Sequence, residues 1–327
     1  MPAPCFSLPR RFDVERLLAD LSVLEELDWP PERPFIMRTP FLARTMTYHD
    51  GKWRGLALRS QGGDRERTDP GGPGLDAFAD TELLARVPAL REAVDSLDCE
   101  KRSVRLLLLP PGAEVHAHTD PYHGFRYGQV RLHVPIRTHP DVRMRFGDQS
   151  FHWPAGELWY ADFGMAHAVE NRSPITRVHL VIDALITPGL LRLFPDDVIQ
   201  EAEAATGILL HQPEAPAAAE ELRRYECDYR LPAALVQGLL ETDDGSVPGE
   251  LGGQIRLDGG RLVLGIEGTA LFALAPIGEG RFHLCGWTAE RSVEFRLGAA
   301  GVDRLVVVLR SGRTESRIEL AAAPPSD

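Results

Sequence analysis

The sequence predicts a mainly β protein, in which a double-stranded β-helix (a jelly roll) with flanking helices is followed by a small antiparallel β domain. Two observations predict the jelly roll. Eight short apolar runs follow one another over residues 104–184, with turn signals between several of them, and no helical pattern separates them, which disfavours a parallel α/β fold. A third observation, a series of hairpin signals after residue 250, predicts the second β segment.

Two amphipathic segments precede the strands. Residues 12–28 carry leucine and valine at helical spacing, and the prolines that follow end that helix. Residues 80–97 repeat the pattern, and we expect Pro88 to kink this helix or to split it. Between the two helices, residues 35–60 alternate as short strands do, and the Gly- and Pro-rich residues 61–74 are expected to form a loop.

The predicted jelly roll occupies the middle of the chain. A cupin-like core of this kind is built from eight closely spaced antiparallel strands in two sheets. With its flanking helices it defines a first domain over residues 1–188. The expected strands are Val104–Leu109, Val115–Asp120, Val130–Ile136, Val142–Phe146, Ser150–Trp153, Glu157–Asp162, His167–Glu170 and Thr176–Ala184.

The C-terminal part is predicted to contain two further pieces. Residues 189–242 have a helical pattern, and residues 243–327 form the small antiparallel β domain, which Asp243–Gly249 would join as a linker. The turn Asp258-Gly-Gly260 between two apolar runs is a strong hairpin signal. A dimerisation module and a peptide-binding module are equally compatible with such a unit, so a homodimer is one possible assembly.

Composition excludes some classes of partner. The chain has 327 residues, a formal net charge of −12, and a hydrophobic content of 43%. The negative charge argues against binding to nucleic acid or to anionic membranes. No apolar run approaches the ~18 residues that a membrane helix needs. The four scattered cysteines and the absence of a signal-peptide pattern lead us to expect a cytoplasmic protein.

A histidine and carboxylate pattern carries the chemistry. His118-x-Asp120 is answered by His167, which supplies the two imidazoles and one carboxylate of the non-haem Fe(II) oxygenase triad. His118 and Asp120 stand two residues apart at a strand end, so their side chains are expected to leave from the same face. His116 has the same parity as His118, so its side chain is expected to point inward too. It could substitute as a ligand, but we favour a place beside the ligands or in solvent.

An arginine strengthens this interpretation. Arg177 follows His167 in a strand whose other residues are apolar. In a jelly-roll oxygenase this position faces the cavity of the metal site. A guanidinium there can bind the far carboxylate of a 2-oxo acid with two parallel hydrogen bonds, which a lysine cannot do.

Residues 100–184 resemble the aspartyl/asparaginyl β-hydroxylase family, in the branch that includes the bacterial proline cis-hydroxylases. The resemblance covers about a quarter of the chain and leaves out residues 243–322. The motifs that carry it are Arg105-Leu-Leu-Leu-Leu-Pro-Pro-Gly112, His118-Thr-Asp120, Arg131-Leu-His-Val-Pro-Ile136, Gly156-Glu-Leu-Trp-Tyr-Ala-Asp162, His167-Ala-Val-Glu-Asn171 and Arg177-Val-His-Leu-Val-Ile-Asp183.

The resemblance implies an iron enzyme that uses 2-oxoglutarate and O2 as cosubstrates. In this family's pattern the catalytic Fe(II) would be held by His118, Asp120 and His167. Arg177 would bind the distal carboxylate of 2-oxoglutarate, and His133 would support the cosubstrate. Arg131 would face either the cosubstrate or a substrate carboxylate.

Four more residues are candidate substrate contacts. Trp53 and Arg59 precede the Gly- and Pro-rich loop, where a substrate lid and a plain edge strand are both possible. Tyr122 and Arg126 follow the strand that carries the first ligands, in a polar loop expected at the mouth of the site.

We therefore expect an Fe(II)/2-oxoglutarate-dependent hydroxylase that acts on an amino acid or on a residue within a peptide. A free amino acid would require a compact pocket with Arg131 on its carboxylate, whereas a peptide would require an open cleft. The main alternative is a cupin-like metal-binding or sensor protein without turnover. A third possibility is a metal oxygenase that uses no 2-oxo acid.

Overall fold

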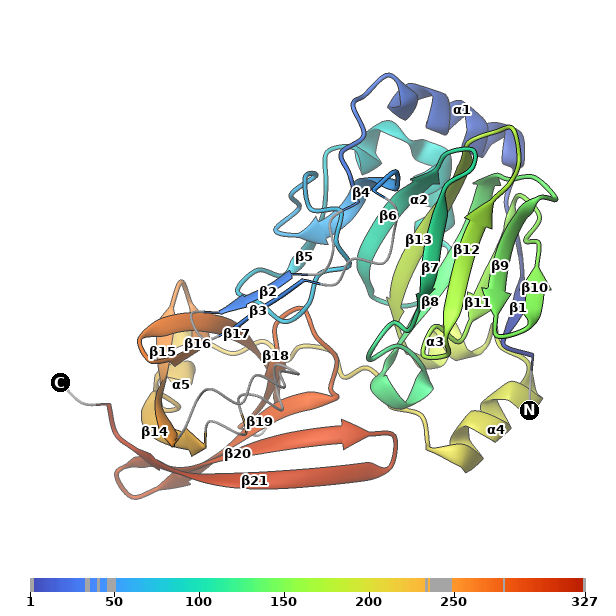
Figure 1. Cartoon of the computed structure of the whole chain (residues 1–327). Helices are drawn as coiled ribbons and strands as arrows, with labels where there is room; N and C mark the ends of the chain where they lie inside the picture. Colours follow the sequence, from blue (N-terminus) through green and yellow to red (C-terminus); the bar gives the residue numbers. More distant parts are fainter. Residues whose placement is uncertain are drawn as a thin grey trace. The chain divides into compact units, whose positions relative to one another are not determined.

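Two compact units make up the chain (Figure 1). A computed structural model describes residues 3–32, 36–39, 42–45, 51–232, 235, 249–278 and 280–325. The first unit comprises residues 1–34, 46–71 and 78–210, and the second comprises residues 35–45, 72–77 and 211–327.

The first unit contains two antiparallel sheets, with strand orders β1-β11-β8-β13-β6-β4-β5 and β10-β9-β12-β7. The eight predicted strands are confirmed as β6 to β13. As in a jelly roll, four of them (β6, β8, β11 and β13) lie in the larger sheet and four (β7, β9, β10 and β12) in the smaller one. The bounds are β1 Cys5–Arg11, β4 Arg54–Gln61, β5 Phe78–Asp80, β6 Lys101–Leu109, β7 Glu114–His118, β8 Gln129–Arg137, β9 Val142–Phe146, β10 Gln149–Phe151, β11 Glu157–Ala161, β12 His167–Asn171 and β13 Arg177–Leu185.

Helices flank this jelly roll. The predicted first helix is α1, Val14–Glu25, which begins where the Asp13 carboxylate accepts two backbone N–H bonds. The predicted second helix is split by Pro88, as expected, into η1 and α2. No helix in the described part of the chain is long and apolar enough to cross a membrane. The remaining bounds are η1 Leu84–Arg86, α2 Pro88–Asp95, η2 Phe125–Tyr127, α3 Pro188–Leu191 and α4 Asp196–Ala205.

The larger sheet has two different faces. On β13 the residues Val178, Leu180 and Ile182 belong to one apolar core with the buried leucines of α1 and α2. The residues between them alternate to the opposite face, which carries Arg177, His179 and Asp183. All nine residues of β13 are buried, so these polar side chains lie inside the protein.

The second unit is a closed eight-stranded barrel. Each strand pairs with its successor in antiparallel fashion, and β14 pairs with β21 to close the ring. The unit also contains the hairpin β2, Ile36–Thr39, with β3, Leu42–Thr45, and the helix α5, Ala219–Arg223. The barrel strands are β14 Cys227–Pro232, β15 Glu250–Asp258, β16 Arg261–Ile266, β17 Thr269–Gly278, β18 Arg281–Leu284, β19 Arg291–Gly298, β20 Gly301–Ser311 and β21 Thr314–Ala323.

The structure differs from the expected helical segment. Residues 189–242 were expected to be helical, but Cys227–Pro232 is the strand β14. Its alternate residues Cys227, Tyr229 and Leu231 are buried, which is the period of a strand, and the pairing of β14 with β15 and β21 closes the barrel. The compact units divide this segment at residue 210. The expected linker Asp243–Gly249 lies, apart from Gly249, outside the described residues.

The start of α2 depends on a side chain from α1. No side chain of its own N-cap residue bonds to α2, and the backbone N–H of Leu90 donates instead to Asp20 Oδ2 at 2.8 Å. Asp20 is buried, so its replacement by alanine leaves this donor unsatisfied. We predict that Asp20→Ala lowers the free energy of unfolding by about 1–3 kcal/mol in urea titrations. An unchanged midpoint would contradict this role of Asp20.

Candidate metal centre

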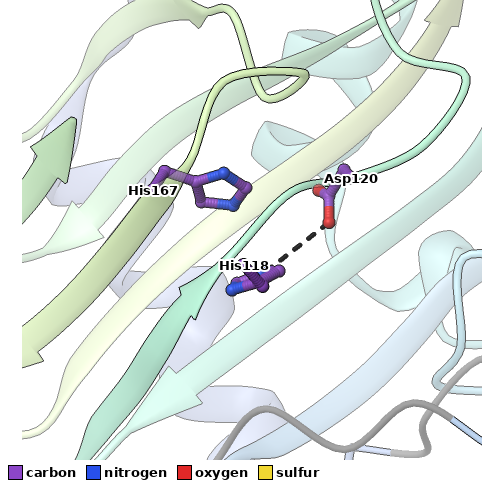
Figure 2. A group of neighbouring side chains, drawn as sticks. All are labelled: His118, Asp120 and His167. Carbon is purple, nitrogen blue, oxygen red and sulfur yellow. Dashed lines mark ion pairs between the residues drawn. The ribbon is translucent and has the colours of Figure 1, made fainter. Parts of the chain in front are cut away.

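Three predicted side chains come together at one end of the smaller sheet. One ligand atom from each of His118, Asp120 and His167 lies within 4.8 Å of the others. Figure 2 shows His118 and His167 on neighbouring strands and Asp120 in the loop that follows β7. The two imidazole centroids are 4.3 Å apart, and His118 Nε2 lies 3.5 Å from Asp120 Oδ1. The three residues therefore converge on a space of the size that a single metal ion occupies.

The pairing of β7 with β12 produces this arrangement. His118 lies opposite His167, and Val115 lies opposite Val169. Between these two pairs, β7 contains one residue more than β12. This irregularity is a β-bulge, a feature that often re-aims side chains beside functional sites. Because of it, Val115 packs in the apolar core while His118 reaches the site.

The bulge also corrects a prediction about His116. Its parity led us to expect an inward side chain, but the extra residue turns it outward, where its side chain is 58% exposed and lies beside Glu114. What His116 contributes to the site is its backbone carbonyl, which accepts a hydrogen bond from His118 Nδ1 at 2.7 Å.

Backbone carbonyls orient both histidines so that Nε2 is the ring nitrogen available to a metal. His118 Nδ1 faces the carbonyl of His116, and His167 Nδ1 faces the carbonyl of Met165 at 3.0 Å. A carbonyl oxygen only accepts hydrogen bonds, so each Nδ1 must carry the proton. Each Nε2 is then left with a lone pair, which is the usual state of a histidine that binds a metal.

Asp120 is held by an arginine from the larger sheet. Its Oδ2 pairs with Arg131 Nη1, and its backbone N–H donates to the carbonyl of Phe163 at 2.8 Å. Arg131 is bound in turn by Asp183, whose Oδ1 lies 2.7 Å from Arg131 Nε. Burial alone would raise the pKa of Asp120, but Arg131 and the neighbouring histidines outweigh it and lower this pKa. The carboxylate is therefore ionised, as a metal ligand must be.

Arg177 has surroundings of a different kind. It is 3% exposed, and no carboxylate in the described part of the chain lies within ion-pair distance of it. Its Nη2 lies 2.6 Å from Nδ1 of His179, and its Nε has no hydrogen-bond partner among the described residues. Burial lowers the pKa of Arg177 to about 9. A buried cation without a counter-ion is costly, so this position is suited to an anionic ligand.

Two neutral imidazoles, those of His133 and His179, lie between Arg177 and the three clustered residues. His133 Nδ1 lies 3.4 Å from His179 Nδ1, and burial, followed by the charge of Arg177, lowers the pKa of both histidines well below the ordinary value. The ring of Phe163 contacts His133 at 5.2 Å and His167 at 4.8 Å between centroids. Because neither His133 nor His179 is charged, neither adds a second cation beside Arg177, and neither supplies it with a counter-charge.

The other predicted contacts are placed less directly. Arg59 lies in β4 and is engaged by Asp80 and by the carbonyls of Lys101 and Phe78. Trp53 packs against the core between the two sheets. The guanidinium of the exposed Arg126 lies over the ring of Tyr127. The ring of Tyr122, which has a left-handed backbone (φ 57°), contacts Tyr127 edge-to-face. In the described part of the chain, neither Arg59 nor Arg126 forms a hydrogen bond or an ion pair with the three clustered residues.

Sequence reasoning missed a set of buried charges beside the centre. Asp183 contacts Arg131, and Arg105 lies 3.3 Å from Glu32 and 3.5 Å from Asp183. Burial raises the pKa of Glu32 to about 8, which Arg105 partly opposes. Charged residues inside otherwise apolar strands were the available signal, since such residues are rarely buried without a partner.

The middle of the chain matches the model of a known protein family. The model of the aspartyl/asparaginyl β-hydroxylase family matches residues 35–186, which include the three clustered residues and Arg177. Residues 35–186 are therefore similar to the aspartyl/asparaginyl β-hydroxylase family. The resemblance predicted from residues 100–184 is therefore confirmed, and the match begins further towards the N-terminus.

One curated relative and two solved structures are similar to parts of the chain. The chain is 28% identical over 195 residues to the L-proline cis-4-hydroxylase of Rhizobium meliloti (strain 1021). This match spans 59% of this chain and 63% of the length of that relative. A 2OG-Fe(II) oxygenase family oxidoreductase from Burkholderia pseudomallei is 12% identical, with a TM-score of 0.36. The match covers 59% of this chain and 89% of that structure. A prolyl-4-hydroxylase from Pseudomonas putida is 17% identical, with 56% and 93% coverage and a TM-score of 0.33. The jelly-roll assignment stands on the strand order, not on these two likenesses.

The buried neutral histidines make stability depend on pH. The unfolded chain binds a proton on His179 near the ordinary pKa of 6.5, whereas the folded protein does so only at much lower pH. The free energy of unfolding of metal-free protein should therefore fall as the pH drops below this value. We predict that His179→Gln reduces that slope, by up to about 1.4 kcal/mol per pH unit, in urea titrations between about pH 7 and pH 5. Equal slopes for the two proteins would show that His179 is not held neutral.

Proposed function

We propose that this protein is an Fe(II)/2-oxoglutarate-dependent oxygenase that hydroxylates an unactivated carbon of an amino acid or of a residue within a peptide. The observation that carries the proposal is the pairing of two features. A cluster of two histidines and one aspartate is connected through a chain of ring contacts to a buried arginine, which has no carboxylate partner among the described residues. The first feature fits iron, and the second fits the far end of a 2-oxo acid.

The donor set fits Fe(II). Nε2 of His118 and of His167 would bind it together with Asp120 Oδ1, because the remaining ring nitrogens and the second carboxylate oxygen already have partners. Such a set occupies one face of the ion and leaves positions for a cosubstrate and for oxygen. When bound, the iron supplies the oxygen-activating chemistry, and the protein supplies orientation and exclusion of water.

Arg177 would hold the distal carboxylate of 2-oxoglutarate. Its planar guanidinium can donate two parallel bonds to a carboxylate, and the anion would supply the counter-charge that the site lacks. His179 would keep the guanidinium in place through the contact at 2.6 Å. His133, whose Nε2 has no hydrogen-bond partner among the described residues, would donate or accept a further bond beside the cosubstrate.

The substrate class rests on the relatives. The curated relative is named as a hydroxylase of L-proline, and the family name refers to aspartyl and asparaginyl residues, so both a free amino acid and a residue in a peptide remain in the proposal. Arg131 already binds two carboxylates, which favours a role in holding Asp120 over one in binding a substrate carboxylate. Trp53, Tyr122 and Arg126 stay proposed contacts. Arg59 is less suited, because its donors are engaged.

Binding of the cosubstrate tests the role of Arg177. We predict that Arg177→Lys weakens binding of 2-oxoglutarate to the Mn(II)-loaded protein by about tenfold or more, because a lysine cannot donate two parallel bonds. Isothermal titration calorimetry under anaerobic conditions measures this. The matched control is Arg172→Lys, since Arg172 is an exposed arginine paired with Glu170. Equal affinity for the Arg177→Lys protein and the parent would remove the cosubstrate assignment.

Turnover tests the activity itself. With Fe(II), 2-oxoglutarate and O2, we predict that succinate formation rises when L-proline, another free amino acid or a peptide containing such a residue is added. His167→Ala should abolish this stimulation, because it removes one of three ligands. A panel that pairs each free amino acid with its N-acetylated amide separates the two substrate classes. Stimulation by no member of the panel would favour a metal-binding protein without turnover.

A further inference from the structure

We propose that Asp183 is a positioning residue for the metal centre, which acts through Arg131 to present one oxygen of Asp120 to the metal. The inference rests on the proposed function, since it assigns Asp120 as a ligand. It goes beyond that function because Asp183 touches none of the three ligands directly. Asp183 is 2% exposed and belongs to the β13 face that carries Arg177 and His179.

The contacts form a continuous path from the sheet to the ligand. Arg131 donates from Nε to Asp183 Oδ1 at 2.7 Å and from Nη2 to Asp183 Oδ2 at 3.2 Å. This bidentate grip uses one edge of the guanidinium and fixes its plane. The remaining Nη1 then points at Asp120 Oδ2. Because Oδ2 is taken, only Oδ1 faces His118 Nε2, which is the arrangement of a ligand that binds through one oxygen.

The sheet makes this path rigid. Asp183 on β13 and Arg131 on β8 are direct cross-strand partners, so their side chains are neighbours by register. Ser103 on β6 donates its hydroxyl to Asp183 Oδ2 at 2.6 Å, and His123 approaches Asp183 Oδ1 at 3.5 Å. Asp120 has no such support from a strand, because β7 ends at His118. The path therefore transfers the order of the larger sheet to a ligand in a loop.

The charges around Arg131 also predict that loss of Asp183 weakens metal binding. Arg131 is a buried cation between Asp120 and Asp183, and Arg105 adds a second cation 3.5 Å from Asp183. Without the Asp183 carboxylate, the charge of Arg131 would fall on Asp120 alone and oppose a divalent cation on that ligand. Loss of Asp183 should thus both loosen the orientation of Asp120 and reduce the attraction of the site for a metal.

Metal affinity is the direct test, with Co(II) as the probe. We predict that Asp183→Asn weakens Co(II) binding by about 10–100-fold in titrations followed by visible absorption and calorimetry, which is the usual effect of losing the group that orients a ligand. The matched control is Asp20→Asn, because Asp20 is also a buried aspartate that accepts a hydrogen bond, but on the helix-facing side of the larger sheet. Asp20→Asn should bind Co(II) as the parent does.

A double-mutant cycle separates positioning from a general structural role. If Asp183 acts through Arg131, then Asp183→Asn should add little to the loss of Co(II) affinity already caused by Arg131→Met. A structural effect of Asp183 would instead add in full. Should Asp183→Asn be recovered unfolded, Ser103→Ala replaces it, with an expected loss of about threefold from one hydrogen bond.

The outcomes distinguish this inference from the proposed function. If His167→Ala weakens Co(II) binding and Asp183→Asn (or its replacement Ser103→Ala) does not, the metal centre stands and the role of Asp183 is overturned. Full additivity in the cycle overturns it as well. If His167→Ala leaves Co(II) binding unchanged, the metal centre itself is wrong, and the inference fails with it.

Discussion

The pairing of β7 with β12 places His118 opposite His167 and, with the bulge between them, decides where the site lies. A regular register would have put Val115 and His118 on opposite faces of the smaller sheet. Because of the extra residue, Val115 packs in the core and the side chain of His118 lies in the site. The two chain segments that meet here are 167 − 118 = 49 residues apart, so the centre forms only when the jelly roll closes. The two backbone carbonyls that fix the imidazole tautomers lie in the residues leading into these ligands.

Electrostatics separates the surroundings of the site into two parts. On one side, buried cations are matched by carboxylates, as with Arg131 between Asp120 and Asp183 and with Arg105 beside Glu32. On the other side, Arg177 faces two histidines that burial keeps neutral. Burying a charge is tolerated where it is paired. Arg131 and Arg105 therefore have their counter-charges within the protein, whereas Arg177 would obtain one only from an added anion. This asymmetry is the basis on which we propose a carboxylate cosubstrate.

Much of this could be predicted from the sequence, for reasons that particular residues make clear. The eight jelly-roll strands were predicted because apolar runs such as Val130–Ile136 alternate and turn residues separate them. The three clustered residues were predicted because few functions require two histidines and an aspartate at such positions. His116 was placed wrongly, because a bulge shifts parity and leaves no local sequence signal. The strand β14 was assigned to a helix, because its partners β15 and β21 are distant in sequence. The link from Asp183 through Arg131 to Asp120 depends on cross-strand register, which composition and spacing do not reveal.

The proposed function requires that one site bind Fe(II) and a 2-oxo acid together. The most direct measurement is the visible spectrum of anaerobic protein with Fe(II), before and after 2-oxoglutarate is added. Chelation of the iron by the 2-oxo acid should produce a weak charge-transfer band, and the band should be absent from the His167→Ala protein. If Fe(II) binds and 2-oxoglutarate produces no band, the centre is a metal site of another kind and the account is contradicted.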